Sequence, residues 1–216
     1  MGKIEELYQW FYQKRAEKCA QALERNGFQA QVFSDASSAV DHILEICKDA
    51  QTIGFGGSLT LAQLGIYKAL KASGKTLLNH GLPNLTLQEK MEILRQQQTC
   101  QLFLTSTNAV TLDGKLVNID GTGNRVSAMT FGPEKVVVVT GANKIVPDVH
   151  TAIQRIKEYA APMNAKRLGF DTPCANTGFC ADCSSPRRIC NIVTILEKCP
   201  PRTPIHVILV AQSLGL

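Results

Sequence analysis

The stretch Lys135-Val-Val-Val-Val-Thr140 is the clearest strand in the sequence, and the fold is worked out from its surroundings. Valine is β-branched, and a continuous apolar run of this length is typical of a strand that is buried on both faces. The loop Gly141-Ala-Asn-Lys-Ile-Val-Pro147 follows it, and a helix is predicted over Asp148–Ala160. Such a strand needs helices above and below it, so the pattern indicates a parallel sheet with helices on both faces.

The same alternation of helix and strand extends in both directions from this stretch. Apolar periodicity and turn residues predict helices over residues 3–26, 34–49, 58–73, 86–98 and 124–131, and strands over residues 28–33, 51–55, 75–78, 101–105 and 205–211. With right-handed crossovers, this order predicts a mostly parallel, Rossmann-like α/β sheet. Asp113-Gly114 lies between two short β-like runs, residues 108–112 and 115–119, and predicts a hairpin that interrupts the parallel order.

The length and the composition predict one domain with a small appendage. A chain of 216 residues can bury one sizeable core, so we expect a single domain over residues 1–216. From about residue 161 to residue 202 the periodicity fades, and this stretch holds five of the eight cysteines and five of the nine prolines. We therefore predict a Cys-rich insertion that folds around something other than a large apolar core.

The charge and the apolar runs limit the partners of the chain. The formal net charge of +5 suits anionic metabolites but falls short of a basic nucleic-acid-binding surface, so no nucleic acid is expected. No apolar run approaches the ~20 residues that cross a bilayer, and the acidic N-terminal sequence lacks the apolar core of a secretory signal. We expect a cytoplasmic protein with no membrane partner, and a homodimer is left open.

Four cysteines in the insertion predict a metal centre. Cys174, Cys180, Cys183 and Cys190 lie within 17 residues, and the Cys-x2-Cys step places two sulfurs on one turn. Zinc ribbons usually have two such steps, whereas one step with irregular outer spacings favours an iron–sulfur cluster, of the 4Fe-4S type. Zinc and a set of free thiols stay open as alternatives. Cys199 is ambiguous, and the other three cysteines are predicted to be core residues.

Three glycine-bearing loops follow predicted strands, at residues 54–60, 120–125 and 141–144. In an open parallel sheet the ligand crevice lies at the carboxyl ends of the strands, where glycine lets the backbone approach an anion. Each loop alone is weak evidence, and their repetition predicts a pocket for an anionic small molecule. The predicted ligand-binding residues are Gly56, Gly57, Ser58, Thr60, Gly121, Thr122, Gly123, Asn124, Arg125 and Asn143.

Two residues near this crevice are candidate catalytic groups. The Asp120 carboxylate is predicted to act as a base or nucleophile, with a turn role as an equal alternative. Lys144 is predicted to lie near the reacting group, whereas Asp113 is interpreted as a turn residue. Of the four histidines only His80, which follows a predicted strand, is expected near the pocket.

Several of these stretches resemble the LUD (lactate-utilisation) domain family. They are Gly56-Gly-Ser-Leu-Thr60, the run from Thr105 to Arg125, Phe131-Gly-Pro-Glu-Lys135 and Gly141-Ala-Asn-Lys-Ile-Val146, and the resemblance covers about residues 10–211. It implies the fold of sugar-phosphate isomerases and CoA transferases, and a bacterial or archaeal cytoplasmic setting. It also implies a link to L-lactate oxidation through multi-protein complexes, and therefore iron–sulfur protein partners. The cysteine segment resembles that of short family members.

Three functions are compatible with the sequence. The first is an accessory or redox component of lactate or organic-acid oxidation, with an anion in the sheet-end pocket and an iron–sulfur cluster on the cysteines. The second is an isomerase or CoA transferase-like enzyme acting on a phosphorylated or CoA-linked substrate. The third is a zinc-stapled binding module, which leaves the glycine loops without a role.

Overall fold

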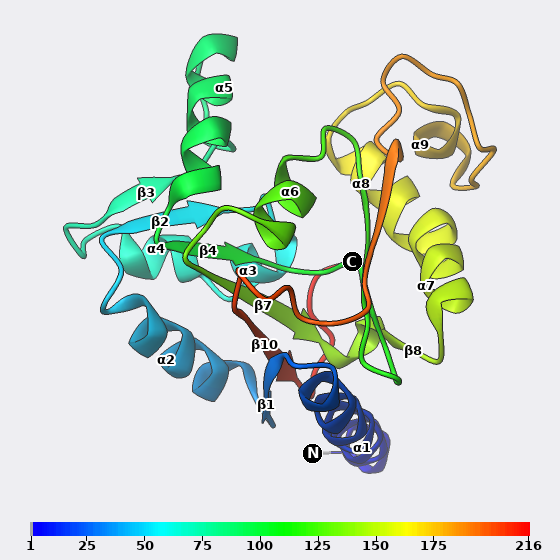
Figure 1. Ribbon diagram of the computed structural model, residues 1–216. Helices are drawn as coiled ribbons and strands as arrows, with labels where there is room; N and C mark the ends of the chain where they lie inside the picture. Colours follow the sequence, from blue (N-terminus) through cyan, green and yellow to red (C-terminus); the bar gives the residue numbers. More distant parts are fainter. Residues whose placement is uncertain (1) are drawn as a thin grey trace.

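The computed structural model describes residues 2–216, and six of its strands form one all-parallel sheet (Figure 1). The strand order is β1-β10-β7-β4-β2-β3, so the last strand of the chain lies between the first strand and the valine strand. The bounds are Gln29–Phe33 for β1, Thr52–Phe55 for β2, Thr76–Leu78 for β3, Leu102–Thr105 for β4, Lys135–Gly141 for β7 and Ile205–Val210 for β10. The parallel α/β sheet predicted from the sequence is confirmed.

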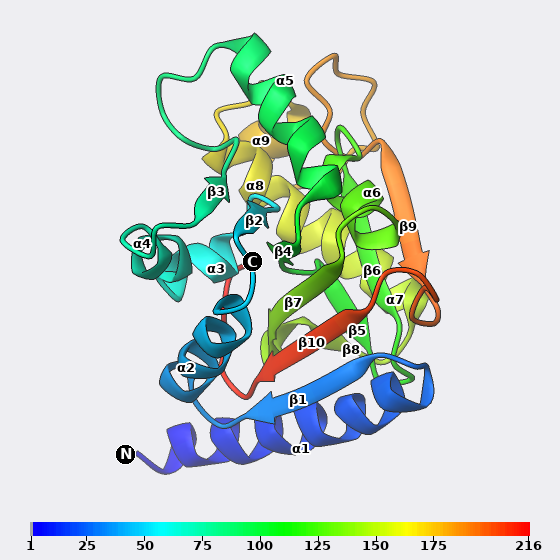
Figure 2. The same ribbon diagram turned by 60° about the vertical axis from the view of Figure 1, so that its left-hand side comes forward.

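Helices cover both faces of this sheet, and the valines of β7 show why. Val136 and Val138 belong to a core cluster with α1 (Lys3–Arg25) and α6 (Asn124–Thr130), and α5 (Leu87–Gln96) packs at its edge. Val137 and Val139 belong to a second cluster with α2 (Ala36–Cys47), α3 (Leu59–Gln63) and α4 (Ile66–Leu70). Alternate residues of a strand point to opposite faces, so four buried valines in a row require cover on both sides. Figure 2 shows that α1 runs alongside β1.

The predicted hairpin belongs to a second sheet of four strands and does not interrupt the parallel sheet. Its order is β8-β5-β6-β9, with bounds Ile145–Val146, Ala109–Thr111, Leu116–Asp120 and Ile192–Leu196 respectively. The β5–β6 hairpin is antiparallel, as expected, but it lies outside the parallel sheet. The reason is that β4, the strand before the hairpin, already pairs with β2 on one edge and β7 on the other.

Two helices differ from the sequence prediction. The helix expected over residues 58–73 is broken into α3 and α4 at Gly65, which has a left-handed φ of +66°. The helix expected to end at Ala160 continues through a π-helical segment, η3 (Ile156–Ala160), into α8 (Ala161–Arg167). Pro162 lies directly after the π-helical segment, and it does not end the helix there.

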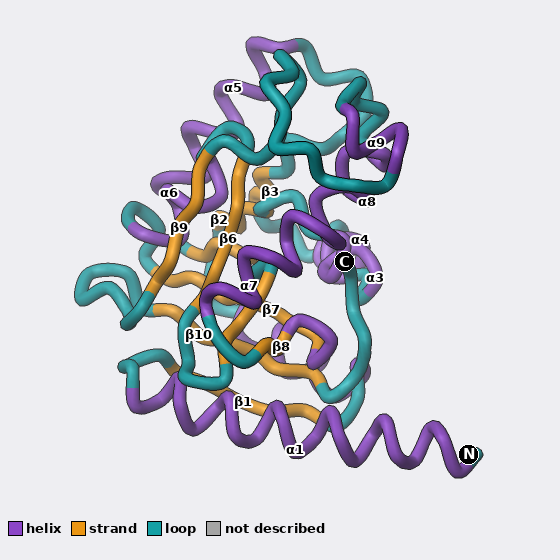
Figure 3. The backbone as a smooth tube through the Cα atoms, turned by 90° about the vertical axis from the view of Figure 1, so that its right-hand side faces the viewer, coloured by secondary structure: helices purple, strands orange, loops and turns teal. Residues whose placement is uncertain are grey.

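The remainder of the Cys-rich segment is a loop around a short helix, α9 (Pro173–Thr177), and it ends in β9. Figure 3 shows this loop beyond the end of α8, next to the ends of β6 and β9. Beneath it, α7 (Val149–Arg155) packs on the second sheet through Ala152, and Ile156 of η3 joins the same cluster. No helix within residues 2–216 combines the length and the apolar character needed to span a bilayer.

Candidate functional site

A large cleft lies where four strands of the parallel sheet end. Its walls come from the residues after β2, β3, β4 and β7, from the loop after β6, and from α8. The cavity volume is about 640 Å³, which is ample for a small organic ligand. This is the position at which open parallel sheets bind ligands, because the strand ends leave a crevice between the flanking helices.

Glycine is required at the point where β2 and β4 leave the sheet side by side. A Cβ at Gly56 would lie 2.4 Å from Thr105 Oγ1, well inside van der Waals contact. The amide of Gly56 donates to the carbonyl of Leu104 over 2.9 Å, so the two strands stay in contact as they enter the cleft. Any larger residue at position 56 would separate them. The glycine therefore shapes the cleft wall.

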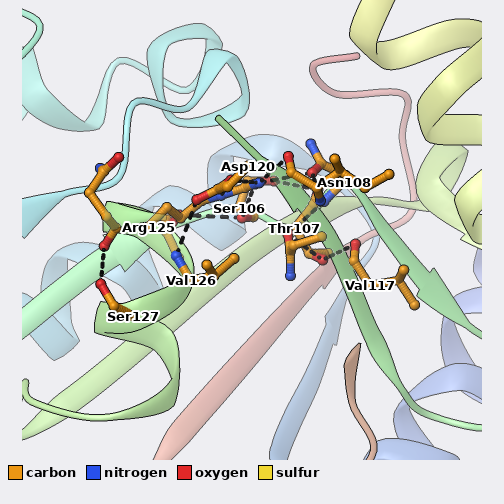
Figure 4. A network of polar contacts seen from close by, with 12 residues as sticks. Ser106, Thr107, Asn108, Val117, Asp120, Arg125, Val126 and Ser127 are labelled. Carbon is orange, nitrogen blue, oxygen red and sulfur yellow. Dashed lines mark hydrogen bonds and ion pairs between the residues drawn. The ribbon is translucent and has the colours of Figure 1, made fainter. Parts of the chain in front are cut away.

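Asp120 and Arg125 form a nearly buried ion pair that ties together the loops after β4 and β6 (Figure 4). Arg125 Nε donates to Asp120 Oδ1 over 2.9 Å, and the backbone amide of Val126 donates to Asp120 Oδ2 over 3.2 Å. Arg125 Nη2 also donates to Asn108 Oδ1 over 2.8 Å. Both carboxylate oxygens are thus engaged in holding the two loops, and a catalytic role of Asp120 stays a prediction.

Lys144 lies on the floor of the cleft and has no acidic partner. It is only 4% exposed, and its Nζ donates to Thr60 Oγ1 over 2.9 Å and to Ser106 Oγ over 3.1 Å. Among residues 2–216 no carboxylate lies within 4.0 Å of it. Burial, followed by repulsion from Arg155 and Arg125, lowers the pKa of the Lys144 amine to about 7. Burying a cation without a counter-charge is unfavourable, so an anion in the cleft would be stabilised here.

His80 faces the cleft from the loop after β3. Its Nδ1 lies 3.1 Å from Gln97 Nε2, which also donates to the carbonyls of Phe55 and Leu78. The two hydrogens of Gln97 Nε2 serve these carbonyls, so the contact with Nδ1 does not fix the tautomer of the ring. Burial is the main cause that lowers the pKa of His80, which favours the neutral ring. The placement of His80 beside the pocket agrees with the sequence expectation.

The structure brings most of the predicted ligand-binding residues to one cleft. Asp120, Lys144 and seven predicted ligand-binding residues line it: Gly56, Gly57, Ser58, Gly121, Thr122, Asn124 and Arg125. Three others are adjacent without lining it. Thr60 accepts from Lys144, Gly123 begins α6 with a φ of +88°, and the Asn143 side chain accepts from the amide of Leu214.

Sequence reasoning missed several residues of the cleft wall. Ser106, Thr107 and Asn108 follow directly after β4, so the rule that ligands bind at strand ends could have identified them. Asn164 and Arg167 come from α8. This helix was not expected, because the sequence predicted that the preceding helix ends at Ala160. No local signal in the sequence points to these two residues.

All four cysteines of the predicted metal centre line a second, much smaller cavity. Cys174, Cys180, Cys183 and Cys190 surround a volume of about 20 Å³, and none of them forms a disulfide. Burial is the main cause that raises the pKa of the Cys190 thiol; Arg188 opposes this rise, and the other three cysteines add to it. The four thiols therefore lie close enough to influence one another electrostatically.

Arg188 donates hydrogen bonds to the backbone around these thiols. Its Nε donates to the carbonyl of Cys190 over 3.0 Å, Nη1 donates to the carbonyl of Cys183, and Nη2 pairs with Asp182 over 2.8 Å. A cation at this position also favours the thiolate forms that bind metal. Three nitrogens of this arginine therefore hold the loop that carries the cysteines.

Four thiols around one cavity are a suitable donor set for zinc or for an iron–sulfur cluster. The cavity itself is about the size of one water-sized sphere. Within residues 2–216 no three His, Cys, Asp or Glu side chains are arranged as metal ligands, so metal binding stays a prediction. The chemistry of the donor set fits, whereas ligation would require the sulfurs to rearrange around the metal.

The two cavities share a wall. Ile189, Cys190 and Ala161 line both the thiol cavity and the large cleft. The connection continues through the backbone, because the amide of Asn191 donates to the carbonyl of Asp120 over 2.9 Å and its side chain donates to the carbonyl of Gly121 over 3.1 Å. The cysteine loop is thus attached to the loop that carries the Asp120–Arg125 pair.

A protein of known structure shares this architecture. A crystal structure of a DUF162 family protein from Deinococcus radiodurans superimposes with a TM-score of 0.52, covering 92% of this chain and 98% of that chain at 14% sequence identity. At this identity the likeness concerns the fold alone. No curated protein matches the sequence. The sequence model of the LUD domain matches residues 16–210, which is most of the chain and includes the thiol cavity and, apart from Leu216, the lining of the large cleft, and the chain therefore belongs to the LUD domain family.

Proposed function

We propose that this protein binds a small organic anion in the cleft above Lys144 and acts as an accessory or redox component of lactate or related organic-acid oxidation. The proposal includes a metal centre on Cys174, Cys180, Cys183 and Cys190, either an iron–sulfur cluster or zinc, and iron–sulfur proteins as partners. The link to lactate rests on the family to which the chain belongs. The buried and uncompensated Lys144 is the observation that carries the proposal.

The charges around the cleft support an anionic ligand. Lys144, Arg125 and Arg167 line it, and Asp120 is the one acidic side chain in its described wall. Because Asp120 is engaged by Arg125, the charge of Lys144 is left for a ligand to neutralise. An anion would lie beside the hydroxyl of Ser106, which lines the cleft and contacts the amine.

The shared wall supports a link between the ligand and the metal centre. An iron–sulfur cluster supplies one-electron transfer when it is bound. Arg188 would hold the cysteine carbonyls and offset thiolate charge, and Cys190 would face the centre on one side and the cleft on the other. Asn191 would keep this wall in contact with the ligand loop.

Ligand binding can be tested through the proton that it takes up. At about pH 8 the free Lys144 amine is mostly neutral, and an anion raises its pKa, so binding should draw a proton from the buffer. Calorimetric titration with L-lactate, pyruvate, ribose 5-phosphate and CoA in two buffers of different ionisation enthalpy measures this uptake. We expect uptake in the natural protein and in Lys115→Met, and none in Lys144→Met. Failure of all four anions to bind would refute the anion site.

The metal centre can be tested by elemental analysis. Protein purified anaerobically and reconstituted with iron and sulfide, or with zinc, should retain one centre per chain, and Cys183→Ser should lose it. Cys199→Ser is the matched control, because Cys199 is also partly buried and free but does not line the thiol cavity. Iron with sulfide would support the redox role and zinc alone a structural one. A chain that retains neither would remove the metal from the proposal.

His80 favours a second candidate function, an isomerase or CoA transferase-like enzyme for a phosphorylated or CoA-linked substrate. A half-buried imidazole whose pKa is lowered by burial, in the same cleft as the Lys144 amine, suits proton transfer. A sugar phosphate that exchanges a carbon-bound proton with deuterated solvent would support this function. We expect His80→Gln to abolish that exchange if the second candidate is correct, and exchange that persists in His80→Gln would exclude it.

A further inference from the structure

Lys144 is the single lysine in the described wall of the cleft, and its surroundings are unusual for an amine. Its Nζ contacts only oxygen atoms that carry no charge: Thr60 Oγ1, Ser106 Oγ and, at 3.4 Å, the carbonyl of Thr107. Lysines whose role is to hold structure usually pair with a carboxylate, as Lys115 does with Glu197. A site without a counter-charge favours the neutral amine, which is a nucleophile.

The electrostatic surroundings make this amine reactive near neutral pH. The positive charges that face it are those of Arg155 on α7 and Arg125 on α6, and Asp120 is already paired with Arg125. With a pKa of about 7, compared with about 10.4 for an ordinary lysine, the neutral fraction at pH 7 is roughly a thousandfold higher. Lys144 should therefore react long before any surface lysine.

We propose that Lys144 forms a Schiff base with the carbonyl carbon of a small oxo acid, a substrate that carries both a ketone or aldehyde and a carboxylate. This inference rests on the proposed anion-binding cleft and names the class of ligand for it. The amine provides the nucleophile, and the cationic wall provides a position for the carboxylate.

The step balances without an oxidant or a reductant. The lone pair of Nζ attacks the carbonyl carbon, a C–N bond forms, and the C=O electron pair moves to oxygen, which takes up a proton. Loss of the second amine proton and departure of the oxygen as water then give the C=N bond. The hydroxyls of Thr60 and Ser106, at 2.9 Å and 3.1 Å from Nζ, are placed to pass these protons.

A further cation in the cleft is available to the carboxylate of an oxo acid. Arg167 lines the cleft from α8, its guanidinium contacts the Asn164 side chain, and no carboxylate within residues 2–216 pairs with it. A planar guanidinium binds a carboxylate through two hydrogen bonds. A neutral ketone would lack this anchor, so the cleft should discriminate between oxo acids and simple ketones.

Reductive trapping tests the inference directly. Natural protein is incubated with pyruvate or glyoxylate and sodium cyanoborohydride, which reduces the imine to a stable secondary amine, and the modified peptide is identified by mass spectrometry. We expect one adduct per chain, on Lys144, with a rate that rises as pH increases through about 7 and then levels off. Surface lysines should react only as pH approaches their higher pKa values. Acetone, which has no carboxylate, should label Lys144 at least tenfold more slowly.

Two variants separate this chemistry from simple anion binding. Lys144→Arg keeps a positive charge but cannot form the imine, so the adduct should disappear, whereas Lys115→Arg should leave the labelling of Lys144 unchanged. Binding without reductant is measured in parallel by calorimetry. Oxo acids that bind to natural protein but leave Lys144 unmodified would overturn the Schiff base and retain the anion site. Equal labelling by acetone would overturn the oxo-acid class, and a complete absence of both binding and labelling would overturn both proposals.

Discussion

At the residue scale, two of the cations in the cleft have opposite circumstances. Arg125 pairs with Asp120 and donates to three further oxygen atoms, of Ser106, Asn108 and Ile119, so it is a structural element of the wall. Lys144 has only neutral oxygens around its Nζ, and folding places its charge in a poorly solvated position without compensation. The two side chains differ in their charged partners and not in their burial, since both are nearly buried.

The buried Lys144 should make stability depend on pH. Its folded pKa, about 7, lies below the value of 10.5 in the unfolded chain, so between these values the unfolded state binds more protons and stability rises with pH. Relative to Lys144→Met, the natural protein should gain up to about 4 kcal/mol between about pH 7 and about pH 10. Urea denaturation of both proteins across this range measures the difference. A constant difference between them would contradict the low pKa.

The Asp120–Arg125 pair should show strong coupling. Removing one partner leaves the other charge buried, so Asp120→Asn and Arg125→Met should each cost about 3 kcal/mol. The double variant should cost clearly less than the sum, because neither charge is then left unpaired. A double-mutant cycle by urea denaturation gives the coupling energy. Additive losses would show that the pair does not hold the loops.

At the element scale, the hairpin packs on the end of α1, and this contact positions the second sheet. Asn26 Nδ2 donates to the carbonyls of Asp113 and Gly114, over 2.8 Å in each case. A Cβ at Gly114 would lie 2.5 Å from the backbone carbon of Ala22. The Asp-Gly turn therefore has two roles, as a turn and as a close contact with the helix. Asp113 is a turn residue, as interpreted from the sequence.

Gly114 and Gly74 form a matched pair for testing this contact. Both have a left-handed φ, +84° and +72°, but no heavy atom lies within 4 Å of a Cβ at Gly74. Gly74→Ala should cost about 1 kcal/mol through backbone strain alone, and Gly114→Ala should cost about 2 kcal/mol more because the helix must move. Thermal unfolding of both variants measures the costs. Equal costs would contradict a tight packing of the hairpin on α1.

At the scale of the whole molecule, the cysteine loop and the ligand loop are joined by Asn191, and β9 continues this contact along β6. The loop between α9 and β9 has no large apolar core, and Phe179 at its surface is 79% exposed. A metal on the four thiols would supply the cohesion that the apolar side chains do not provide.

Removal of the metal should therefore loosen both loops. In hydrogen exchange, a chelated sample should lose protection at residues 174–191 and, to a smaller degree, at residues 120–123, because Asn191 donates to the carbonyls of Asp120 and Gly121. Residues 136–139 in the sheet should not change, because they are buried on both faces. Protection lost at residues 174–191 alone would contradict the connection between the two sites.

The sequence predicted most of the fold from local patterns. The valine run of β7, the Asp35 cap of α2 and the Asp-Gly turn each act through neighbouring residues, and each is seen in the structure. The errors lie where distant contacts decide. The hairpin leaves the parallel sheet because β4 is already paired on both edges, and β9 forms because β6 offers it an edge.

For the site, the sequence by itself determined which residue types follow the strand ends: glycines, hydroxyls, Asp120, Arg125 and Lys144. It also determined that four thiols lie within one short segment. Only the tertiary structure decided their partners. It paired Asp120 with Arg125, left Lys144 without a counter-charge, and placed Arg188 on the cysteine carbonyls. The reason is that burial and charge compensation depend on segments far apart in the chain, which a local pattern does not encode.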